Sequence, residues 1–400
     1  MNANIAKLYQ IANQKERMII GLMSGTSMDG LDVALCRISG SGLATELELL
    51  NFATMPYTDE FRKSVKAIFS KRDADLEQVC LMNEVIAITH ATLILRALEQ
   101  WNRKPEHVDA IASHGQSIFH APKSLHQLPN LPNGTLQIGD GDHIAVKTGI
   151  ITLSDFRQKH IAAGGEGAPL AVYGDYLFFS QAGENRIMLN IGGIANFTFL
   201  PGDGNAERVF STDVGPGNTI MDQYVQQHYP GNYYDKDAMI AKKGHLNTAL
   251  LDALLADEFF DQGYPKTTGP ELFNLQYLTN AQQISDTQHL SQEDVMATLC
   301  HFSAQGIIRA IKTTLGKDTD PMHLFMSGGG MHNPLLLELL KQELNGAKFD
   351  TTAALQVHPD AKEAVLFALL ANETLAGKPI DFGGRKGIPA VCMGKISFPV

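Results

Sequence analysis

The chain has 400 residues, of which 44% are hydrophobic and 19% are charged, and its formal net charge is −11. This length exceeds what one hydrophobic core comfortably holds, so two domains are expected, and the acidic balance argues against nucleic acid or an anionic membrane as the main partner. The four cysteines are scattered without paired spacing, which disfavours a disulfide framework or a zinc site. No apolar run looks long enough to span a membrane, and residues 1–16 lack the apolar core of a signal peptide. We therefore expect a soluble, cytoplasmic protein.

A glycine-rich segment, GLMSGTSMDGLD at residues 21–32, lies between two short apolar runs at 17–20 and 33–38. Strand, small-residue turn and strand predict a β-hairpin, whose glycines allow backbone amides to approach an anion. Its two carboxylates can hold a divalent cation or its waters, so the segment suggests ATP with Mg²⁺. The alternative is an ordinary glycine hairpin, because no Walker A motif is present. The expected ATP contacts are Gly25, Thr26, Ser27, Met28, Asp29, Gly30, Leu31 and Asp32.

Two later segments repeat this use of glycine. Residues 186–200 again show strand, Gly-Gly turn and strand, and residues 322–330 form a strand that ends in three glycines. Asn333 is a good N-cap and Pro334 a good first residue for the helix that follows, so purine and ribose can lie on this corner. The further expected ATP contacts are Asn190, Gly192, Gly193, Gly328, Gly329 and Gly330.

The order of these three segments resembles the actin, hexokinase and sugar-kinase superfamily. The resemblance implies an α/β, two-domain actin/hexokinase-like ATPase fold, with mixed sheets flanked by helices and an ATP cleft between the domains. Helical spacing from residue 73 to 101, followed by an apolar run at 108–114, agrees with alternating helices and strands. We expect one domain from residues 1–155 plus 378–400, with the last residues adding a strand to it. We expect the other from residues 156–377, with the second hairpin, the adenosine-binding glycines and most of the sugar site.

A closer resemblance runs from about Ile19 to the C-terminus, in the strings GLMSGTSMDGLD, SHGQSIFH, TLQIGD, SDFRQKHIAAGGEGAPL, LNIGGIANFTF, STDVGPGNTIMD and FMSGGGMHNP. These strings are similar to the anhydro-N-acetylmuramic acid kinases of bacteria. The resemblance implies that ATP and water convert 1,6-anhydro-N-acetylmuramic acid to N-acetylmuramic acid 6-phosphate in cell-wall recycling, and that the protein is a homodimer. Two residues depart from the family pattern: Glu166 stands where glutamine is common, and Val214 where a small residue or threonine is common.

Two carboxylates are the catalytic candidates. Asp213 lies next to a glycine-rich corner, where it suits a general base that takes a proton from water as the water attacks the anomeric carbon. Spacing alone favours Asp213 as the N-cap of the next helix, whereas the resemblance favours the base. Glu363 matches a family glutamate near the same site, and by pattern alone it is a first-turn helix charge.

The expected substrate contacts are His114, Gln116, Asp155, Arg157, Gly167, Ala168 and Pro169. The planar guanidinium of Arg157 suits the lactyl carboxylate of a muramic acid, and the glycine loop allows the sugar to approach backbone amides. A salt bridge between Asp155 and a neighbour, and a structural role for His114, are the alternatives. For the whole chain, the rival functions are a different sugar kinase of the superfamily or an actin-like ATPase.

Overall fold

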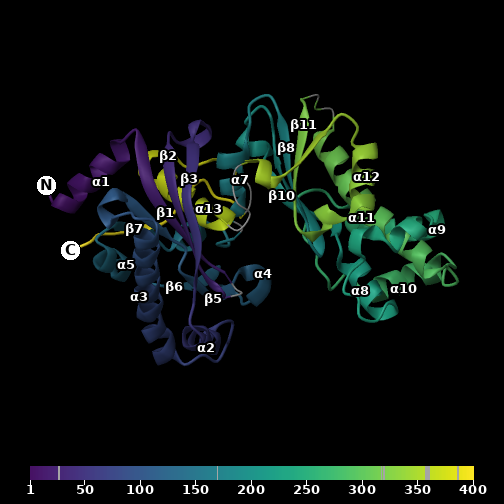
Figure 1. Cartoon of the computed structure of the whole chain (residues 1–400), viewed down its shortest axis with the longest axis horizontal. Coiled ribbons are helices and arrows are strands. Elements are labelled where there is room, and N and C mark those ends of the chain that lie inside the picture. Colours follow the sequence, from purple (N-terminus) through teal and green to yellow (C-terminus); the bar gives the residue numbers. More distant parts are fainter. Residues whose placement is uncertain (26–27, 169, 317, 319, 356–360, 385–386) are drawn as a thin grey trace. The chain divides into compact units, whose positions relative to one another are not determined.

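Figure 1 shows a computed structural model of the chain, which describes all residues except 26–27, 169, 317, 319, 356–360 and 385–386. The chain forms two compact units: unit 1 is Met1–Phe179 with Val357–Val400, and unit 2 is Ser180–Gln356. These divisions differ from the expected boundaries at 155 and 378. The helices α6 (Phe156–Ala162), α7 (Ala171–Phe179) and α13 (Lys362–Ala376) belong to unit 1, because α13 packs on β1 and on α7, and α6 packs on β6.

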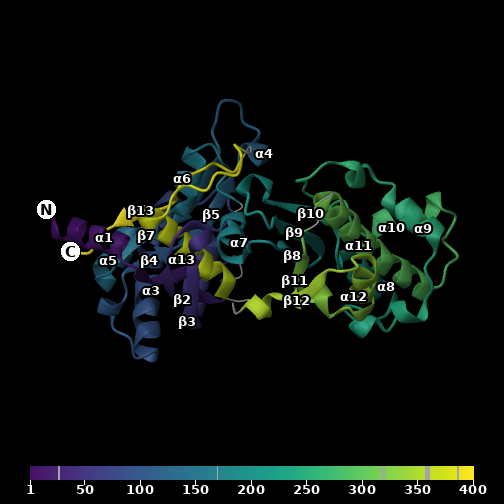
Figure 2. The same ribbon diagram turned by 90° about the horizontal axis from the view of Figure 1, so that it is seen from above.

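Unit 1 is built on a mixed sheet with the strand order β13-β7-β4-β1-β2-β3. Its strands are β1 (Glu16–Ser24), β2 (Gly30–Ser39), β3 (Glu46–Pro56), β4 (Ala110–Ser113), β7 (Ile151–Ser154) and β13 (Lys395–Ser397). β1 to β3 form an antiparallel meander, and β4 and β7 run parallel to β1. The predicted C-terminal strand is confirmed, because β13 pairs antiparallel with β7, beside which it lies in Figure 2. A separate ribbon pairs β5 (Gln116–Ala121) with β6 (Gly134–Ile138).

The remaining helices described in unit 1 are α1 (Ala3–Asn13), α2 (Asp59–Ile68), α3 (Leu76–Gln100), α4 (Lys123–His126) and α5 (Gly141–Thr148). α13 packs against β1 so closely that a Cβ on Gly21 would lie 1.9 Å from the carbonyl oxygen of Ala364. Glycine at this position therefore lets the last long helix reach the first strand. The predicted helix at 73–101 is α3, whose N-cap Asp75 accepts the amide of Glu77 at 2.9 Å.

α3 is long and apolar enough to cross a membrane by length and composition alone, contrary to the expectation that no run reaches that length. Within unit 1 it contributes Met82, Ile86 and Ile94 to the hydrophobic core. A core helix of a protein meets the same length and composition criterion. One side of α3 packs into this core, and 39% of its apolar window is buried.

Unit 2 repeats the plan of unit 1, as the sequence predicted. Its sheet has the order β10-β9-β8-β11-β12, in which β10, β9 and β8 form an antiparallel meander and β11 and β12 run parallel to β8. The strands are β8 (Asn185–Ile191), β9 (Ile194–Leu200), β10 (Phe210–Pro216), β11 (Met322–Ser327) and β12 (Lys348–Thr351). A glycine turn thus joins the first two strands of the meander in unit 2, matching the β1–β2 hairpin of unit 1.

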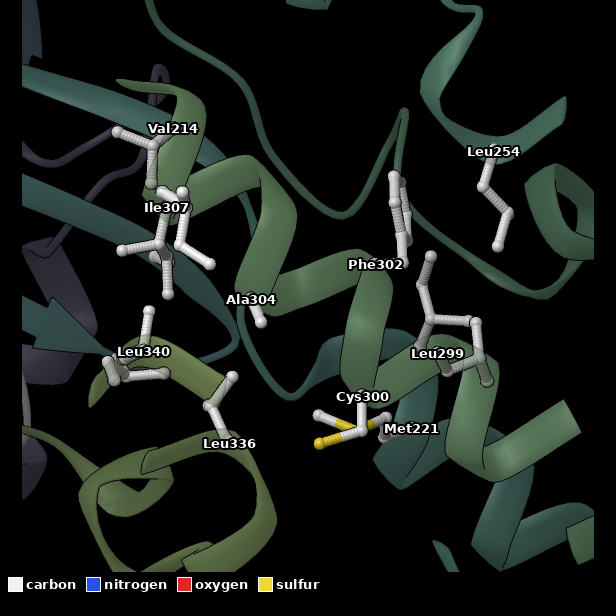
Figure 3. Packing of buried hydrophobic residues seen from close by; sticks show 14 of the residues in the cluster. Val214, Met221, Leu254, Leu299, Cys300, Phe302, Ala304, Ile307, Leu336 and Leu340 are labelled. Carbon is white, nitrogen blue, oxygen red and sulfur yellow. The ribbon is translucent and has the colours of Figure 1, made fainter. Parts of the chain in front are cut away.

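The helices described in unit 2 are α8 (Thr219–His228), α9 (Thr248–Leu255), α10 (Leu275–Ile284), α11 (Gln292–Leu315) and α12 (Pro334–Glu343). α11 is the central one: it packs on β10, α8, α9 and α12, and its side chains Leu299, Phe302 and Ile307 lie in the core drawn in Figure 3. Val214 is in the same core with 1% of its surface exposed, so this departure from the family pattern fills apolar space.

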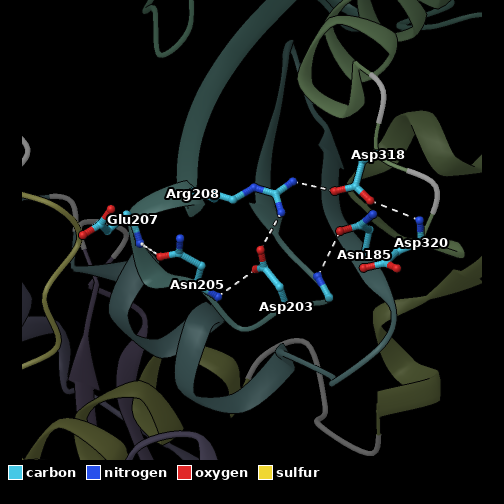
Figure 4. A network of polar contacts seen from close by, with 8 residues as sticks. Asn185, Asp203, Asn205, Glu207, Arg208, Asp318 and Asp320 are labelled. Atoms are coloured by element: carbon cyan, nitrogen blue, oxygen red, sulfur yellow. Dashed lines mark hydrogen bonds and ion pairs between the residues drawn. The ribbon is translucent and has the colours of Figure 1, made fainter.

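A polar network holds two connections of unit 2 together at one end of its sheet (Figure 4). Arg208 donates to Asp203 at 2.7 Å and to Asp318 at 2.5 Å. These bonds lower the pKa of Asp318, and they help lower that of Asp203, whose largest cause is the amide of Asn205. The arginine therefore ties the turn after β9 to the connection before β11.

Candidate active site

The first hairpin is confirmed, since β1 and β2 pair from Glu16 with Ser39 to Ser24 with Leu31. Its tip is anchored by Met28 and Leu31, which are buried in the core of unit 1. Thr26 and Ser27 lie outside the described residues. Asp29 remains exposed, and Asp32 accepts a hydrogen bond from Thr54 Oγ1 at 2.6 Å.

A chain of hydrogen bonds fixes the two residues that flank the turn of this hairpin, Ser24 and Asp29. Tyr57 donates from its hydroxyl to Ser24 Oγ at 2.9 Å, and its amide donates to the carbonyl of Asp29 at 3.2 Å. Ser24 in turn donates to Gln116 Oε1 at 2.5 Å, and Nε2 of His90 lies 2.9 Å from the Tyr57 hydroxyl. Gln116 is only 2% exposed, so the structure places this expected sugar contact beneath the hairpin.

Arg157 and His114 lie together in unit 1. The guanidinium donates to Nε2 of His114 from Nε at 3.2 Å and from the second terminal nitrogen at 3.0 Å. Burial, with the nearby charge of Arg157, lowers the pKa of His114 to about 3, so the imidazole is neutral. Because His114 is 2% exposed, its ring supports Arg157 beneath the surface of the unit.

The glycine loop before α7 is fixed by the same arginine. Arg157 donates to the carbonyl of Gly167 at 2.6 Å, and the amide of Gly167 donates to Nδ1 of His160 at 3.0 Å. The amide of Gly167 therefore has a partner within the loop, and the expected contact of Gly167 with the sugar stays a prediction. Ala168 is half-buried, Pro169 lies outside the described residues, and Glu166 contacts Ser124 Oγ at 3.3 Å.

Glu363 lies in the first turn of α13, within the electrostatic reach of Asp32 and Arg157. Desolvation raises the pKa of Glu363 and the charge of Asp32 raises it further, whereas Arg157 and Lys362 lower it. Two carboxylates and an arginine thus gather in unit 1 from β2, α6 and α13. Glu363 and Arg157 are therefore close enough for the charge of Arg157 to lower the pKa of Glu363. The sequence had assigned these two residues to separate roles.

Asp155 forms the expected alternative contact, an ion pair with Lys395 at 2.5 Å. Its backbone is left-handed, with φ of 52°, and its buried Oδ1 has no hydrogen-bond partner among the residues that the structure describes. It lines a cavity of about 290 Å³ in unit 1, together with residues from α3, α5, β6, β13 and the ends of β4 and β7. This cavity also includes His114, whereas Arg157 is not among its lining residues.

In unit 2, the β8–β9 turn receives the start of α8. The carbonyl of Gly193 accepts hydrogen bonds from the amides of Gly217 at 2.8 Å and Thr219 at 3.1 Å. The carbonyl of Gly192 accepts a hydrogen bond from the amide of Asn218 at 2.9 Å. A Cβ on Gly217 would lie 2.2 Å from the carbonyl oxygen of Gly192, so only glycine permits this approach. The second predicted hairpin and the helix beside it are therefore one rigid corner.

The predicted glycine corner after β11 lies against the same turn. Gly328 has φ of 82°, and a Cβ there would lie 2.7 Å from Asn190 Oδ1. Asn333 caps α12 by accepting the amide of Leu336 at 3.0 Å, which confirms the helix start read from the sequence. Four of the residues expected to bind ATP, namely Asn190, Gly192, Gly328 and Gly330, thus cluster around Ile191 and the β8–β9 turn.

A pocket of about 370 Å³ opens beside this corner, entirely within unit 2. Its lining comprises Asn218, Met221, Asp222, Tyr234, Asp235, Lys236, Asp237, Gly329, His332 and Asn333. Burial raises the pKa of Asp222 to about 6. Gly329 alone among these residues was predicted from the sequence as a nucleotide contact. The signal in the sequence for the other side of this pocket is the polar and aromatic run from Tyr234 to Asp237.

Asp213 lies on β10, where a bulge between Asp213 and Gly215 interrupts the pairing with β9. The helix α8 begins only at Thr219, so Asp213 is not its N-cap and that alternative is wrong. The amide of Thr268 donates to Oδ2 of Asp213 at 2.9 Å. Burial raises the pKa of Asp213, the Thr268 amide lowers it, and the charge of Glu271 raises it. A carboxylate with a raised pKa beside a bulge in a strand fits proton transfer.

The repeated sheet plan, with a glycine turn in each unit and a pocket at the glycine corner, defines an α/β protein of the sugar-kinase and actin fold class. A family model described as anhydro-N-acetylmuramic acid kinase matches residues 17–396. The chain belongs to this family. The expected enzyme class, a kinase acting on an amino sugar in cell-wall recycling, is thereby confirmed.

Curated relatives agree with this assignment along the whole chain. An anhydro-N-acetylmuramic acid kinase of Pseudoalteromonas atlantica is 54% identical over 401 residues, covering 100% of each chain. A relative of the same description from Caldanaerobacter subterraneus is 37% identical, covering 98% of this chain and 99% of its own. Among solved structures, the ligand-bound xylulose kinase from Lactobacillus acidophilus aligns with 76% of this chain and 56% of its own, at 12% identity and a TM-score of 0.33.

Proposed function

We propose that this chain opens the 1,6-anhydro ring of 1,6-anhydro-N-acetylmuramic acid with water and phosphorylates the released oxygen from ATP, giving N-acetylmuramic acid 6-phosphate. Asp213 is the general base. Water attacks the anomeric carbon and gives a proton to Asp213, while the bond from that carbon to the anhydro oxygen breaks. The anhydro oxygen uses the released electron pair to attack the γ-phosphorus, and ADP leaves. The observation that carries this proposal is the carboxylate of Asp213, half-buried with a raised pKa and held at Oδ2 by one amide.

The remaining site residues position charge, which is most of what phosphoryl transfer requires. The glycine corner of unit 2 and its pocket offer a surface for adenosine, and the hairpin tip of unit 1 offers amides to the phosphates. Arg157, held by His114, binds the lactyl carboxylate of the sugar through its remaining donors. Glu363 is the second catalytic carboxylate, which holds the attacking water or the base. The ATP cleft between the domains stays a prediction.

Magnesium fits the carboxylates of unit 1. Within the described residues no group of three or more His, Cys, Asp or Glu side chains forms a metal cage. Magnesium would arrive with ATP, and this ion usually keeps several of its waters. Asp29 and Asp32 at the hairpin would hold those waters. The ion supplies neutralisation of phosphate charge, and it would also offset the repulsion between Asp32 and Glu363.

An assay with the anhydro sugar, ATP and magnesium tests this function, with simple hexoses and N-acetylmuramic acid as the comparison substrates. We expect ADP formation only with the anhydro sugar. Phosphorylation of a hexose at a similar rate would favour a different sugar kinase, and sugar-independent ADP formation would favour an actin-like ATPase. Replacing Asp213 by asparagine should lower kcat by about 10²- to 10⁴-fold, the loss typical of removing a general base.

We also propose a cytoplasmic homodimer without a nucleic acid or membrane partner. The cysteines Cys36, Cys80, Cys300 and Cys392 are free thiols, which fits a reducing compartment. The net charge of −11 disfavours association with polyanions. Light scattering on the purified protein should give twice the chain mass of 43.6 kDa, and a monomer at all concentrations would contradict the dimer.

A further inference from the structure

The segment from Gln262 to Thr268, here called the Lys266 strap, runs alongside β10 at the position of Asp213. The amide of Asp213 donates to the carbonyl of Lys266 at 3.0 Å, and the amide of Lys266 donates to Thr212 Oγ1 at 3.0 Å. Two residues later, the amide of Thr268 donates to Oδ2 of Asp213 at 2.9 Å. The strap therefore holds both the backbone and the carboxylate of the proposed base.

The strap is anchored by the side chain of Lys266, which is only 8% exposed. Its ammonium donates to the carbonyls of Phe259 at 2.6 Å and Gln262 at 3.5 Å. It also lies 4.2 Å from the ring centroid of Phe259 and 4.7 Å from that of Tyr264. A buried ammonium is costly unless carbonyls and aromatic faces replace its water. This set of contacts replaces that water and locks the strap to the short helix Glu258–Asp261.

The contacts of the Lys266 ammonium are structural ones. The ammonium contacts carbonyls and rings of residues 259–264, and Lys266 does not line the pocket beside the glycine corner. Burial lowers the pKa of Lys266, and the charge of Asp261 raises it. Among the described residues, Oδ1 of Asp213 accepts no hydrogen bond, so this oxygen remains available to take a proton.

We propose that Lys266 is a positioning residue for Asp213: its buried ammonium fixes the strap, and the strap's Thr268 amide orients the carboxylate so that Oδ1 can receive the proton of water. This inference rests on the proposed role of Asp213 as the base. It differs from a general stabilising role because it ties Lys266 to the protonation of one carboxylate. A donor to Oδ2 favours the charged form, so losing the orientation raises the pKa of Asp213.

The test is the pH profile of kcat/KM for the sugar in Lys266→Met, a substitution that keeps the length of the side chain and removes its charge. We expect kcat to fall by about 10- to 100-fold, as for a misplaced catalytic group, with the KM for ATP unchanged within about twofold. The acidic limb of the profile should move up by about one pH unit. Lys242→Met, an exposed lysine in the same unit, is the matched control and should behave as the unmodified protein.

A second variant, Thr268→Pro, removes the amide donor and leaves the ammonium in place, so it decides the question if Lys266→Met does not fold. It should show the same displaced acidic limb. A folded Lys266→Met or Thr268→Pro with an unmoved acidic limb, whether or not activity falls uniformly with pH, would overturn the inference. Asp213→Asn, measured in parallel, separates the role of Asp213 as base from the role of Lys266 in positioning it. Near-normal turnover in Asp213→Asn would contradict the role of Asp213 as base. If Asp213→Asn is inactive and the acidic limb of the pH profile is unmoved in Lys266→Met and Thr268→Pro, only the role of the Lys266 strap is contradicted.

Discussion

The guanidinium of Arg157 and the imidazole of His114 form a partly buried pair in which the arginine donates two hydrogen bonds to one nitrogen, Nε2. This geometry requires the Nε2 lone pair, so the proton of the neutral ring is on Nδ1. Arg157 also donates to the carbonyl of Gly167. A guanidinium held on two sides is preorganised to present its remaining donors to an anion, which is why we assign it to the carboxylate of the sugar.

Replacing Arg157 by lysine tests this assignment. Lysine keeps the charge but loses the planar fork, so the KM for the sugar should rise by about 10- to 100-fold, with little change in the KM for ATP. Initial-rate kinetics with each substrate varied in turn measure the two constants. Lys159→Met, an exposed change on the same helix, should leave both constants as they are. A sugar KM unchanged in Arg157→Lys would remove Arg157 from the substrate site.

Buried neutral histidines predict how stability depends on pH. Burial lowers the pKa of His90 to about 3, and burial together with Arg157 lowers that of His114 to about 3. In the unfolded chain both titrate near 6.5, so below that pH the unfolded state binds protons that the folded state does not. The free energy of unfolding should therefore fall from about pH 6.5 downward, by up to about 1.4 kcal/mol per pH unit for each histidine.

Urea unfolding at several pH values between 7 and 5 measures this slope. Glutamine at position 90 does not titrate, so His90→Gln should make the slope shallower while lowering stability at pH 7. Equal slopes in the two proteins would contradict the neutral state of His90.

Gly329 offers a direct probe of the pocket in unit 2. Among the described residues, the atom nearest to a Cβ there would be Asn218 Nδ2 at 3.9 Å, and the φ of Gly329 is not positive. Gly329→Leu should therefore fold with an unchanged melting temperature, while its side chain enters the pocket and weakens ATP binding by about tenfold or more. Calorimetric titration with a non-hydrolysable ATP analogue measures the affinity.

A glycine of the first hairpin is a poorer probe. A Cβ on Gly30 would lie 2.6 Å from the carbonyl oxygen of Met55, so substitution there disturbs β3. Undiminished affinity in a folded Gly329→Leu would mean that the nucleotide does not use this pocket.

The pKa of Asp222 predicts a pH dependence of nucleotide binding. Burial raises this pKa to about 6, so the carboxylate is charged at pH 7.5 and mostly protonated at pH 5. A charged carboxylate accepts stronger hydrogen bonds from the hydroxyls of a ribose than a protonated carboxyl group does. The dissociation constant for ATP should therefore increase as the pH falls through 6, and Asp222→Asn should flatten that dependence. The same dependence in Asp222→Asn would assign the titration to another group.

Local features of this fold could be predicted from the sequence because neighbouring residues determine them. The hairpins at 17–38 and 186–200 follow from apolar runs around glycines, and the helix start at Asn333 follows from its capping side chain. The domain boundaries could not be read in this way, because α13 joins unit 1 through a close approach to Gly21.

The site was predictable in its residue types more than in its contacts. Arg157 meets His114 across 43 residues of sequence, and Thr268 meets Asp213 across 55. The spacing of residues along the sequence does not predict such contacts, because they depend on tertiary packing. Lys266 gave no signal at all, because a lone lysine in a loop is usually solvated, and only the rings and carbonyls around its ammonium show that it is buried.

The central claim, that water attacks the anomeric carbon with Asp213 as base, is tested most directly by running the reaction in oxygen-18 water. The phosphate should receive the old anhydro oxygen, because that atom leaves the anomeric carbon and attacks the γ-phosphorus. We therefore predict label on the anomeric hydroxyl of N-acetylmuramic acid 6-phosphate and none in its phosphoryl group, in mass spectra taken before that hydroxyl exchanges with solvent. Label in the phosphoryl group, or none on the sugar at early times, would contradict the mechanism.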